Sequence, residues 1–408
     1  MVGKWLATTA ALALALMLGV APARADCTIT VGLVMELTGP AGEYGQAGAK
    51  SVEMAFRDLN DAGGPHGCKL VTDTRDSQSA GNVAVDVATQ LVQVKKVPVL
   101  IGGIISSVTI PILTSVTAPA KVVQVSPASS SPTLTALGRE GKTNGIFFRT
   151  ITSDALQGVA AAKYALDQGF KKIAVIHVNN DFGANLYKEF ARAYKSLGGV
   201  IVSVTPYNEK QSSYQAEATA AMAGDPDGLY LISTPVDGAT IARAWISQGG
   251  VAKFLLNDGM NSPDFISSVG AKYLADAYGT SSGTSPTAST EYFNANYKTF
   301  SGGIDPANPA ADRSYDAGAI VGLAIAAAPT QDPLAIRDAI YKIEDPAGAV
   351  IHAGKPIRYE GVLGPVSFDK YGEITGPFRL WKIVDGKVTT TGAMSTGEDN
   401  ALIAKIDK

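Results

Sequence analysis

The chain has 408 residues, which is too long for one ordinary hydrophobic core, so we expect two domains. Its 34 Lys and Arg residues against 37 Asp and Glu residues give a net charge of −3. Because no stretch is strongly basic, the sequence predicts no nucleic-acid partner.

The first 25 residues are typical of a secretory signal peptide. Lys4 precedes an apolar run over residues 6–20, and residues 23–25 fit the small-x-small cleavage rule. We therefore predict export, with cleavage after Ala25. A membrane anchor is the alternative, which the shortness of the run disfavours. A lipoprotein at Cys27 is disfavoured because Asp26 stands where a small residue is needed.

Short apolar runs alternate with helical patterns along the first part of the mature chain. We expect strands at residues 29–35, 69–72, 97–101 and 122–125, separated by helices at 46–59, 80–94 and 108–117. Runs that are apolar throughout suit parallel strands that are buried on both faces, so the pattern predicts βαβ winding.

The same alternation restarts after Phe147, Phe148 and Arg149. It predicts a helix at residues 154–167, then strands at 172–178, 200–205, 228–232 and 253–256, separated by helices at 185–196, 213–223 and 238–247. A second wound sheet follows from this pattern.

Residues 278–286 are rich in Gly and Ser with no apolar period, which indicates a break between structural units. Beyond it we expect helices at 290–300, 314–327 and 333–342, which return to complete the first domain, and strands at 366–368 and 378–384, which cross back to the second. The predicted fold is therefore α/β, with two doubly wound lobes joined by a three-strand hinge. Lobe I takes residues 26–147 and 282–358, and lobe II takes 148–281 and 359–408.

The two cysteines, Cys27 and Cys68, each stand at the start of an apolar run. If these runs are neighbouring parallel strands, a disulfide joins their first residues, and export favours such a bond. Closing a loop of about 40 residues is worth roughly 3 to 4 kcal/mol. Two free thiols are the alternative.

Polar residues follow the predicted strands where each strand ends. Ser106 and Ser107 follow one strand and residues 126–131 the next, while residues 177–183, 233–235 and 257–261 end strands of the second sheet. Ligands bind at this edge of an open α/β sheet, so we expect a cleft between the two lobes. The alternative is that the serines serve only as turn and cap residues.

Residue patterns for catalysis are weak. Residues 279–283 match G-x-S-x-G, but a nucleophile elbow needs a strand before the motif and a helix directly after it. The three histidines are scattered and the cysteines are assigned to a disulfide, so we expect no metal and no cofactor. We accordingly predict a binding protein rather than an enzyme.

Six motifs together carry a resemblance to a known family. They are LTGPAGEYG at residues 37–45, NDAGG at 60–64, IGGIISS at 101–107, SPASSSP at 126–132, FFR at 147–149 and SYDA at 314–317. In order and spacing they are similar to the type I periplasmic solute-binding proteins of the leucine/isoleucine/valine-binding family. The resemblance implies a monomeric periplasmic receptor whose lobes close over a small solute bearing a carboxylate and then dock on the permease of an ABC importer.

The resemblance also implies ligand contacts. Hydroxyl and backbone groups that bind the solute carboxylate match Ser106, with Ser107 beside it, Ala128 and Ser130. Aromatic wall residues match Tyr44 and Phe182, a small residue at Thr234 enlarges the pocket, and an acid that meets the ammonium group matches Asp258. Such donors hold a carboxylate without Lys or Arg.

Several alternatives stay open at this point. Asp258 could be a turn residue, and Tyr44 and Phe182 could be ordinary packing residues. An aliphatic or branched-chain amino acid is the expected solute, and an aromatic or other non-amine carboxylate is the runner-up, because the two rings could stack on it. A sensory ligand-binding module or a hydrolase on the same fold is the remaining alternative.

Overall fold

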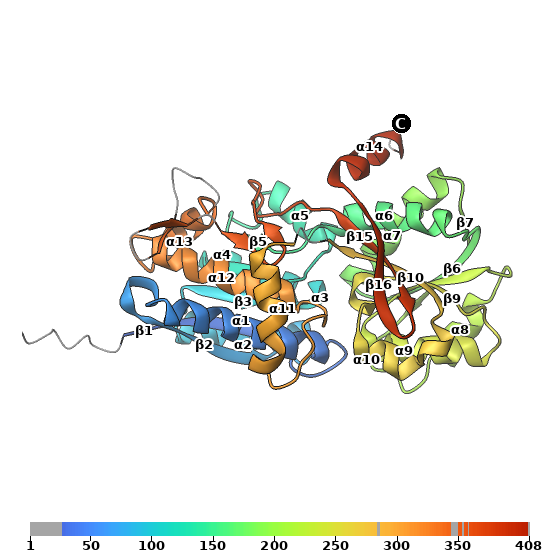
Figure 1. The fold of residues 1–408 in the computed structure, drawn as a ribbon, viewed down its shortest axis with the longest axis horizontal. Helices are drawn as coiled ribbons and strands as arrows, with labels where there is room; N and C mark the ends of the chain where they lie inside the picture. The colour runs from blue at the N-terminus through green and yellow to red at the C-terminus, as the bar shows by residue number, and fades with distance from the viewer. Residues whose placement is uncertain (1–26, 284–285, 344–349, 353–354, 358, 407–408) are drawn as a thin grey trace, which may run out of the picture.

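A computed structural model describes residues 27–283, 286–343, 350–352, 355–357 and 359–406. The signal peptide expected at residues 1–25 lies outside these described residues. Figure 1 shows two lobes side by side, each built around its own β-sheet. Within the described residues, no helix combines the length and apolarity that a bilayer crossing requires.

The first sheet has five parallel strands in the order β2-β1-β3-β4-β5. Their bounds are Thr28–Met35 for β1, Lys69–Asp76 for β2, Val99–Gly102 for β3, Val123–Ser126 for β4 and Phe147–Arg149 for β5. Side chains of β1 alternate between two apolar cores, with Val31 and Leu33 on one face and Val34 on the other. Both faces of the sheet are therefore buried, as the apolar runs predict.

Helices cover both faces of this sheet. One face is covered by α1 (Gly42–Asp61), α12 (Ala311–Ala327) and α13 (Pro333–Ile340), and the other by α2 (Gly81–Thr89) and α3 (Ser106–Ile112). Ala317, Ile320 and Val321 of α12 share a core with β1, so the predicted return of these late helices to the first lobe is confirmed. The remaining elements of this lobe are η1 (Pro65–Gly67), η2 (Gln90–Val94), η3 (Leu113–Thr117), α4 (Ala118–Ala120), α5 (Pro132–Arg139), α11 (Ala288–Phe300), β11 (Val350–His352), β12 (Lys355–Ile357), β13 (Glu360–Gly361) and β14 (Gly364–Pro365).

The second sheet has the order β16-β15-β10-β9-β8-β6-β7. Its strands are β6 (Lys172–Val178), β7 (Val200–Tyr207), β8 (Gly228–Ile232), β9 (Lys253–Leu256), β10 (Asp276–Ser282), β15 (Phe378–Val384) and β16 (Lys387–Met394). The strands from β6 to β10 pair in parallel, whereas β15 and β16 run antiparallel. Helices pack on it, namely α6 (Asp154–Asp167), α7 (Asp181–Ser196), α8 (Gln215–Ala221), α9 (Pro235–Ser247), α10 (Pro263–Val269) and α14 (Thr396–Ile406), with the short turns η4 (Asp258–Met260) and η5 (Ala271–Tyr273).

The interpretation of residues 278–286 as a break is wrong for the first part of that segment, because β10 runs through it in the middle of the second sheet. The strand lacks an apolar period because its buried side chains are small hydroxyls that find partners, such as Ser282 Oγ with Thr152 Oγ1 at 3.2 Å. Gly279 is needed there because a Cβ would lie 2.2 Å from the Trp381 ring. A strand in place of a strand–turn–helix also rules out a nucleophile elbow at this motif.

The exact bounds of the lobes stay a prediction, but the cores show on which side individual segments lie. The predicted boundary after residue 147 falls inside β5, whose three residues all belong to the first sheet. Val366 packs in the first lobe's core, and residues 366–368 form no strand, so the chain crosses back to the second lobe after Glu373. The hairpin partner β16 and the helix α14 have no counterpart in the sequence prediction.

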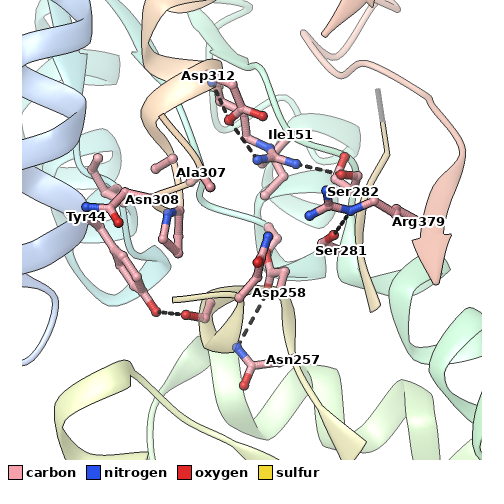
Figure 2. Close-up of a pocket in the computed structure, with 18 of the residues that line it drawn as sticks. Tyr44, Ile151, Asn257, Asp258, Ser281, Ser282, Ala307, Asn308, Asp312 and Arg379 are labelled. Carbon is pink, nitrogen blue, oxygen red and sulfur yellow. Dashed lines mark hydrogen bonds and ion pairs between the residues drawn. The ribbon is translucent and has the colours of Figure 1, made fainter. Parts of the chain in front are cut away.

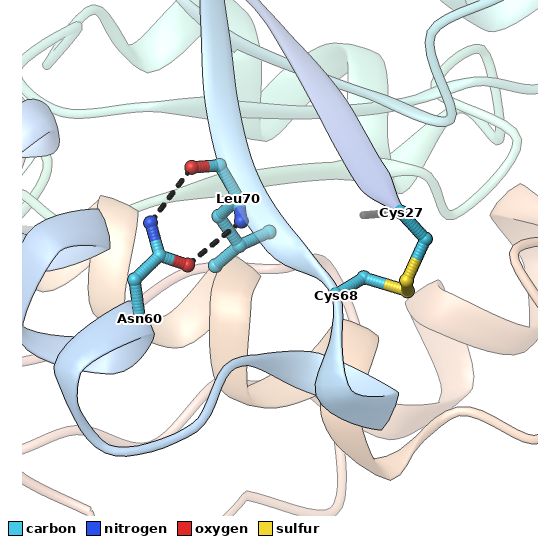
Figure 3. The surroundings of a disulfide bond; sticks show 4 residues. All are labelled: Cys27, Asn60, Cys68 and Leu70. Atoms are coloured by element: carbon cyan, nitrogen blue, oxygen red, sulfur yellow. Dashed lines mark hydrogen bonds between the residues drawn. A yellow bond between two sulfur atoms is a disulfide. The ribbon is translucent and has the colours of Figure 1, made fainter. Parts of the chain in front are cut away.

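A disulfide joins Cys27 and Cys68, as the sequence predicts. Figure 3 shows it where β1 and β2 begin side by side. Asn60 lies nearby and pairs with both backbone groups of Leu70, accepting from its N–H at 2.8 Å and donating to its C=O at 2.9 Å. The start of β2 is thus held from both sides, by the covalent bond to β1 and by the end of α1.

We expect the double variant Cys27→Ser/Cys68→Ser to lose about 3 to 4 kcal/mol of unfolding free energy, because the unfolded chain gains the entropy of an opened loop. The two cysteines are 41 positions apart in the chain. Urea unfolding of the variant and of the wild type, each with and without reductant, measures the loss. Reductant should lower the stability of the wild type alone, and alkylation of both cysteines in non-reduced protein would contradict the bond.

Candidate functional site

A cavity of about 330 Å³ lies between the lobes. Figure 2 shows it with walls from both. Its wall includes residues that follow parallel strands, namely Ile104, Ile105 and Ser106 after β3, Ala128 and Ser130 after β4, Ile151 after β5, Phe182 after β6, Ser233 and Thr234 after β8, and Asn257, Asp258 and Gly259 after β9. The volume is at the lower end of the range of about 300 to 1,000 Å³ for small-molecule pockets.

Ser106 begins α3 and is buried in the first lobe's wall of the cavity. Its hydroxyl oxygen accepts a hydrogen bond from the backbone N–H of Ser131 at 3.2 Å. Since this bond uses a lone pair of Ser106, the hydroxyl hydrogen is available to a group in the cavity. The arrangement suits donation to an anion.

Glu36 lies fully buried beneath the same loop. Its carboxylate accepts from the backbone N–H of Ile104 at 3.0 and 3.1 Å and from that of Ile105 at 3.2 Å. Burial raises the pKa of Glu36 to about 7, although these hydrogen bonds act in the opposite direction. The turn itself needs Gly102, which has φ +125° and no room for a Cβ beside the Val34 carbonyl. Glu36 therefore holds in place the two residues that directly precede Ser106.

Ser130 lies in the loop after β4 and donates from its hydroxyl to Asp154 Oδ2 at 2.9 Å. Asp154 is fully buried at the start of α6, and burial, together with the negative charge of Asp258, raises its pKa well above the usual range. A protonated Asp154 can instead donate to Ser130, which frees the Ser130 hydroxyl to donate into the cavity. The role of Ser130 as a donor thus depends on the proton held by Asp154.

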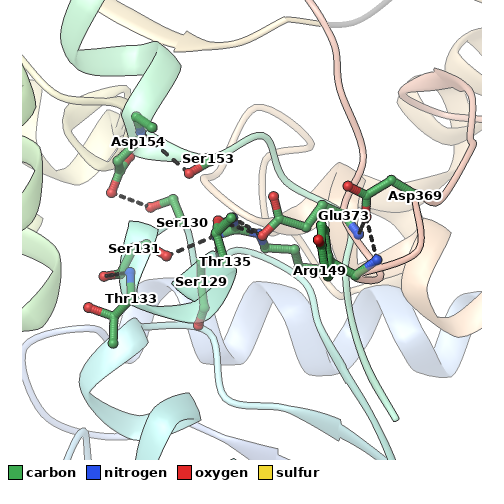
Figure 4. Close-up of polar contacts among 12 residues, drawn as sticks. Ser129, Ser130, Ser131, Thr133, Thr135, Arg149, Ser153, Asp154, Asp369 and Glu373 are labelled. Atoms are coloured by element: carbon green, nitrogen blue, oxygen red, sulfur yellow. Dashed lines mark hydrogen bonds and ion pairs between the residues drawn. The ribbon is translucent and has the colours of Figure 1, made fainter. Parts of the chain in front are cut away.

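Arg149 organises the loop that carries Ala128 and Ser130, as Figure 4 shows. Its fully buried guanidinium donates to the carbonyls of Ser129 and Ser131, both at 3.1 Å, and pairs with Glu373 at 2.6 Å. The same guanidinium reaches Thr135 Oγ1 at 2.9 Å. One side chain thus joins the loop after β4, the helix α5 and the segment that leads back to the second lobe.

Asp258 follows β9 and borders the cavity from the second lobe. Asn257 steadies it, because the Asn257 side chain donates to Asp258 Oδ1 at 3.4 Å and accepts from the backbone N–H of Ser233 at 2.9 Å. With its amide nitrogen turned toward Asp154, Gln157 accepts from the Asp258 N–H at 3.2 Å. An anion held in place here can receive a cation.

Thr234 stands directly before α9 and is buried in the cavity wall. Its hydroxyl oxygen has no hydrogen-bond partner among the described residues. A buried hydroxyl without a partner costs about 1 to 3 kcal/mol, so a solute group that pairs with it is favoured.

Tyr44 lies in the first turn of α1, because this helix begins at Gly42 rather than at residue 46 as the sequence predicts. Its ring lines the cavity, and its hydroxyl donates across the cleft to the carbonyl of Gly259 at 2.8 Å. Beside it, the Ser262 hydroxyl donates to Glu43 Oε2 at 2.6 Å. Both bonds join the two lobes, so the structure represents a closed arrangement.

Phe182 borders the cavity and also packs against the apolar cores on both faces of the second sheet. The cavity thus brings together most of the residues that the sequence singles out, namely Tyr44, Ser106, Ala128, Ser130, Phe182, Thr234 and Asp258. Ser107 does not line it, because successive helical residues point about 100° apart, and the Ser107 carbonyl lies beside Gly81 at the start of α2.

A family model described as periplasmic binding protein matches residues 28–387. The chain belongs to this family. It is 26% identical over 365 residues to the Leu/Ile/Val-binding protein homolog 3 of Brucella melitensis, covering 88% of this chain and 92% of that protein.

Solved structures of other binding proteins share the fold. The substrate-binding protein LivJ of Streptococcus pneumoniae, solved with isoleucine, has a TM-score of 0.76 at 23% identity, covering 90% of this chain and 99% of LivJ. A solute-binding protein of R. palustris, solved with 4-hydroxybenzoate, has a TM-score of 0.77 at 18% identity, covering 92% of this chain and all of that protein. The family is one of extracytoplasmic binding proteins, and at these identities the solved structures establish the fold of this member.

Sequence reasoning missed the end of the cavity that is formed by Ser281, Ser282, Asp312, Arg313 and Arg379. Two of these residues lie on β10, which the sequence does not predict, and Arg379 opposes Ser281 across the antiparallel pair of β10 and β15. The strand at 378–384 is predicted correctly, but its neighbour and its direction are not, so no signal placed Arg379 in the cleft.

We expect Glu36→Gln to flatten part of the pH dependence of stability. The folded pKa of about 7 exceeds the ordinary 4.5, so the stabilisation from this proton is complete below about pH 4.5 and is lost as the pH rises through about 7. Urea unfolding between about pH 5 and 8 measures the slope. The exposed Glu291→Gln should keep the wild-type slope, and an unchanged slope for Glu36→Gln would contradict the assignment.

We expect Arg149→Met to lower the unfolding free energy by about 3 to 5 kcal/mol, because it leaves Glu373 and two carbonyls without their partner. The matched control is Arg337→Met, which breaks the exposed pair with Asp338 and should cost less than about 1 kcal/mol. Denaturant titration measures both. Equal losses for the two variants would mean that the buried network does not stabilise the loop.

Proposed function

We propose that this protein is the periplasmic receptor of an ABC importer and captures an amino acid of the branched-chain or aliphatic type between its closing lobes. The observation that carries this proposal is that Ser106 of the first lobe and Asp258 of the second border one cavity. A donor on one lobe and an acid on the other match the two charged groups of an α-amino acid.

The chemistry of the walls supports this assignment. The solute carboxylate would accept from the Ser106 hydroxyl and from Ser130, while its ammonium group would donate to Asp258. Because these groups sit on different lobes, only the closed form engages both ends of the solute. Part of the binding free energy would therefore stabilise the closed form. A permease can distinguish this closed form from the open one.

The remaining parts of the proposal rest on the sequence and the family. We propose a monomer that is exported with cleavage after Ala25, binds its solute without converting it, needs no metal or cofactor, and delivers the solute to a membrane permease. The lobes would comprise residues 26–147 with 282–358 and residues 148–281 with 359–408. The exceptions are residues 148–149, which lie in the first sheet, and Val366, which packs in the first lobe's core.

An aromatic carboxylate is the second candidate, since the rings of Tyr44 and Phe182 both border the cavity. Such a solute would stack on a ring and would leave Asp258 without a cationic partner. The R. palustris neighbour, solved with 4-hydroxybenzoate, gives this candidate its support.

We expect L-leucine, L-isoleucine or L-valine to raise the melting temperature, and Asp258→Asn to weaken that binding by roughly 10- to 100-fold, because a hydrogen bond to a charged group is lost. Ser106→Ala should weaken it by about tenfold. Thermal-shift screening followed by isothermal titration calorimetry measures the effects.

The control is Asp225→Asn, an exposed change in the second lobe that should leave affinity unaltered. Stabilisation by benzoate or 4-hydroxybenzoate, with Asp258→Asn behaving like the wild type, would replace the amino-acid assignment with the aromatic carboxylate.

A further inference from the structure

Two arginines lie at one end of the cavity, where the chain passes between the lobes. Arg379 stands at the beginning of β15 and Arg313 in the first turn of α12, and both line the cavity wall. Figure 2 shows Arg379 beside Ser281 and Ser282, on the far side of Asp258 from Tyr44.

Arg313 is largely satisfied by the protein itself. It is 8% exposed, donates to the carbonyl of Ser282 at 2.8 Å and pairs with Asp312 at 3.0 Å. Its charge is thus balanced by a neighbouring carboxylate, and its position is fixed by β10.

Arg379 is not satisfied in this way. Its Nε donates to Ser281 Oγ at 3.2 Å, and among the described residues no carboxylate lies within ion-pairing distance of it. Burial lowers the pKa of Arg379, the negative charge of Asp312 acts in the opposite direction, and the positive charge of Arg313 lowers the pKa further. Two guanidinium groups therefore share one carboxylate, and a positive charge remains at this end of the cavity.

The bond to Ser281 does not account for an arginine at this position. It uses Nε alone, and a neutral donor could make it, whereas the two terminal nitrogens of Arg379 have no hydrogen-bond partner among the described residues. These two nitrogens form the planar fork that binds a carboxylate through two parallel hydrogen bonds. Holding such a charge half-buried and unpaired is costly, and an anion from the solute would offset that cost.

We propose that Arg379, backed by Arg313, forms a second anion-binding subsite, so that the preferred solute is an α-amino acid whose side chain ends in an anionic group. This proposal rests on the amino-acid receptor function and deepens it, because aliphatic amino acids such as L-leucine would enter the same cavity but an acidic one would bind more tightly by also reaching Arg379. The α-carboxylate would occupy the Ser106 end, the ammonium group would meet Asp258, and the side-chain anion would reach Arg379.

The test compares solutes of matched size on the wild-type protein by isothermal titration calorimetry, in a buffer free of carboxylates and phosphate. L-Glutamate and L-glutamine differ in the charge of the side-chain end, and L-2-aminoadipate extends the reach by one carbon. We expect one of the two acids to bind at least tenfold more tightly than L-glutamine and L-leucine. No preference for either acid would overturn the proposal without the need for any variant.

Substitutions then assign the preference to the subsite. Arg379→Gln should weaken binding of the acid by about 10- to 100-fold and leave L-glutamine affinity nearly unchanged, while Arg379→Lys should retain part of the preference because the charge remains without the fork. Lys382→Gln removes a positive charge from an exposed position on the same strand and should have no effect. An acid preference that persists in Arg379→Gln would overturn the proposal.

The outcomes separate this proposal from the function on which it rests. If L-leucine binds and neither acid does, the receptor function stands and the second subsite is wrong. If no amino acid binds but glutarate does, and its binding is lost in Arg379→Gln, the anion subsite stands and the amino-acid function is wrong.

Discussion

Strand direction is the constraint on which the cavity depends. Helices cover both faces of each sheet, so polar groups can gather in number only at the carboxyl ends of the parallel strands. Ser106 and Ser130 follow strands of the first sheet, and Thr234 and Asp258 follow strands of the second. The strand β15 runs antiparallel to its neighbour β10, so its first residues, including Arg379, lie at the edge where β10 ends.

Contacts between the lobes enclose this shared edge. Tyr44 donates to a backbone carbonyl of the second lobe, and Glu43 accepts from the Ser262 hydroxyl, so the first turn of α1 is bonded to the second lobe beside the cavity. Burial, with the negative charge of Asp264 nearby, raises the pKa of Glu43 to about 7, against the hydrogen bond from Ser262. Neither contact uses Ser106 or Asp258, the groups that would hold the two charged ends of an amino acid. The closed arrangement can thus be stabilised by contacts of α1 while Ser106 and Asp258 stay available to the solute.

The sequence predicts those parts of the structure in which local pattern and burial agree. The strands at Lys172–Val178 and Gly228–Ile232 match their predicted bounds because continuous apolar runs belong in a sheet that is buried on both faces. The sequence prediction fails at β10, where buried hydroxyls are satisfied by partners that are distant in the chain, such as Thr152. The sequence indicates Arg149 only as part of a motif, since its contact with Glu373 spans 224 positions and no local pattern predicts a pairing of that separation.

The distribution of charge between the lobes indicates how selectivity is divided. The first lobe offers hydroxyls on two loops, one held by Glu36 and the other by Arg149, and any carboxylate can use these hydroxyls. The second lobe carries both Asp258 and Arg379, which are opposite in charge and border the same cavity. A solute must therefore place a cation and an anion in fixed order along the second lobe to satisfy both. A change at Arg379 should therefore alter which side chain is accepted, whereas a change at Asp258 or at Ser106 should affect all amino acids alike.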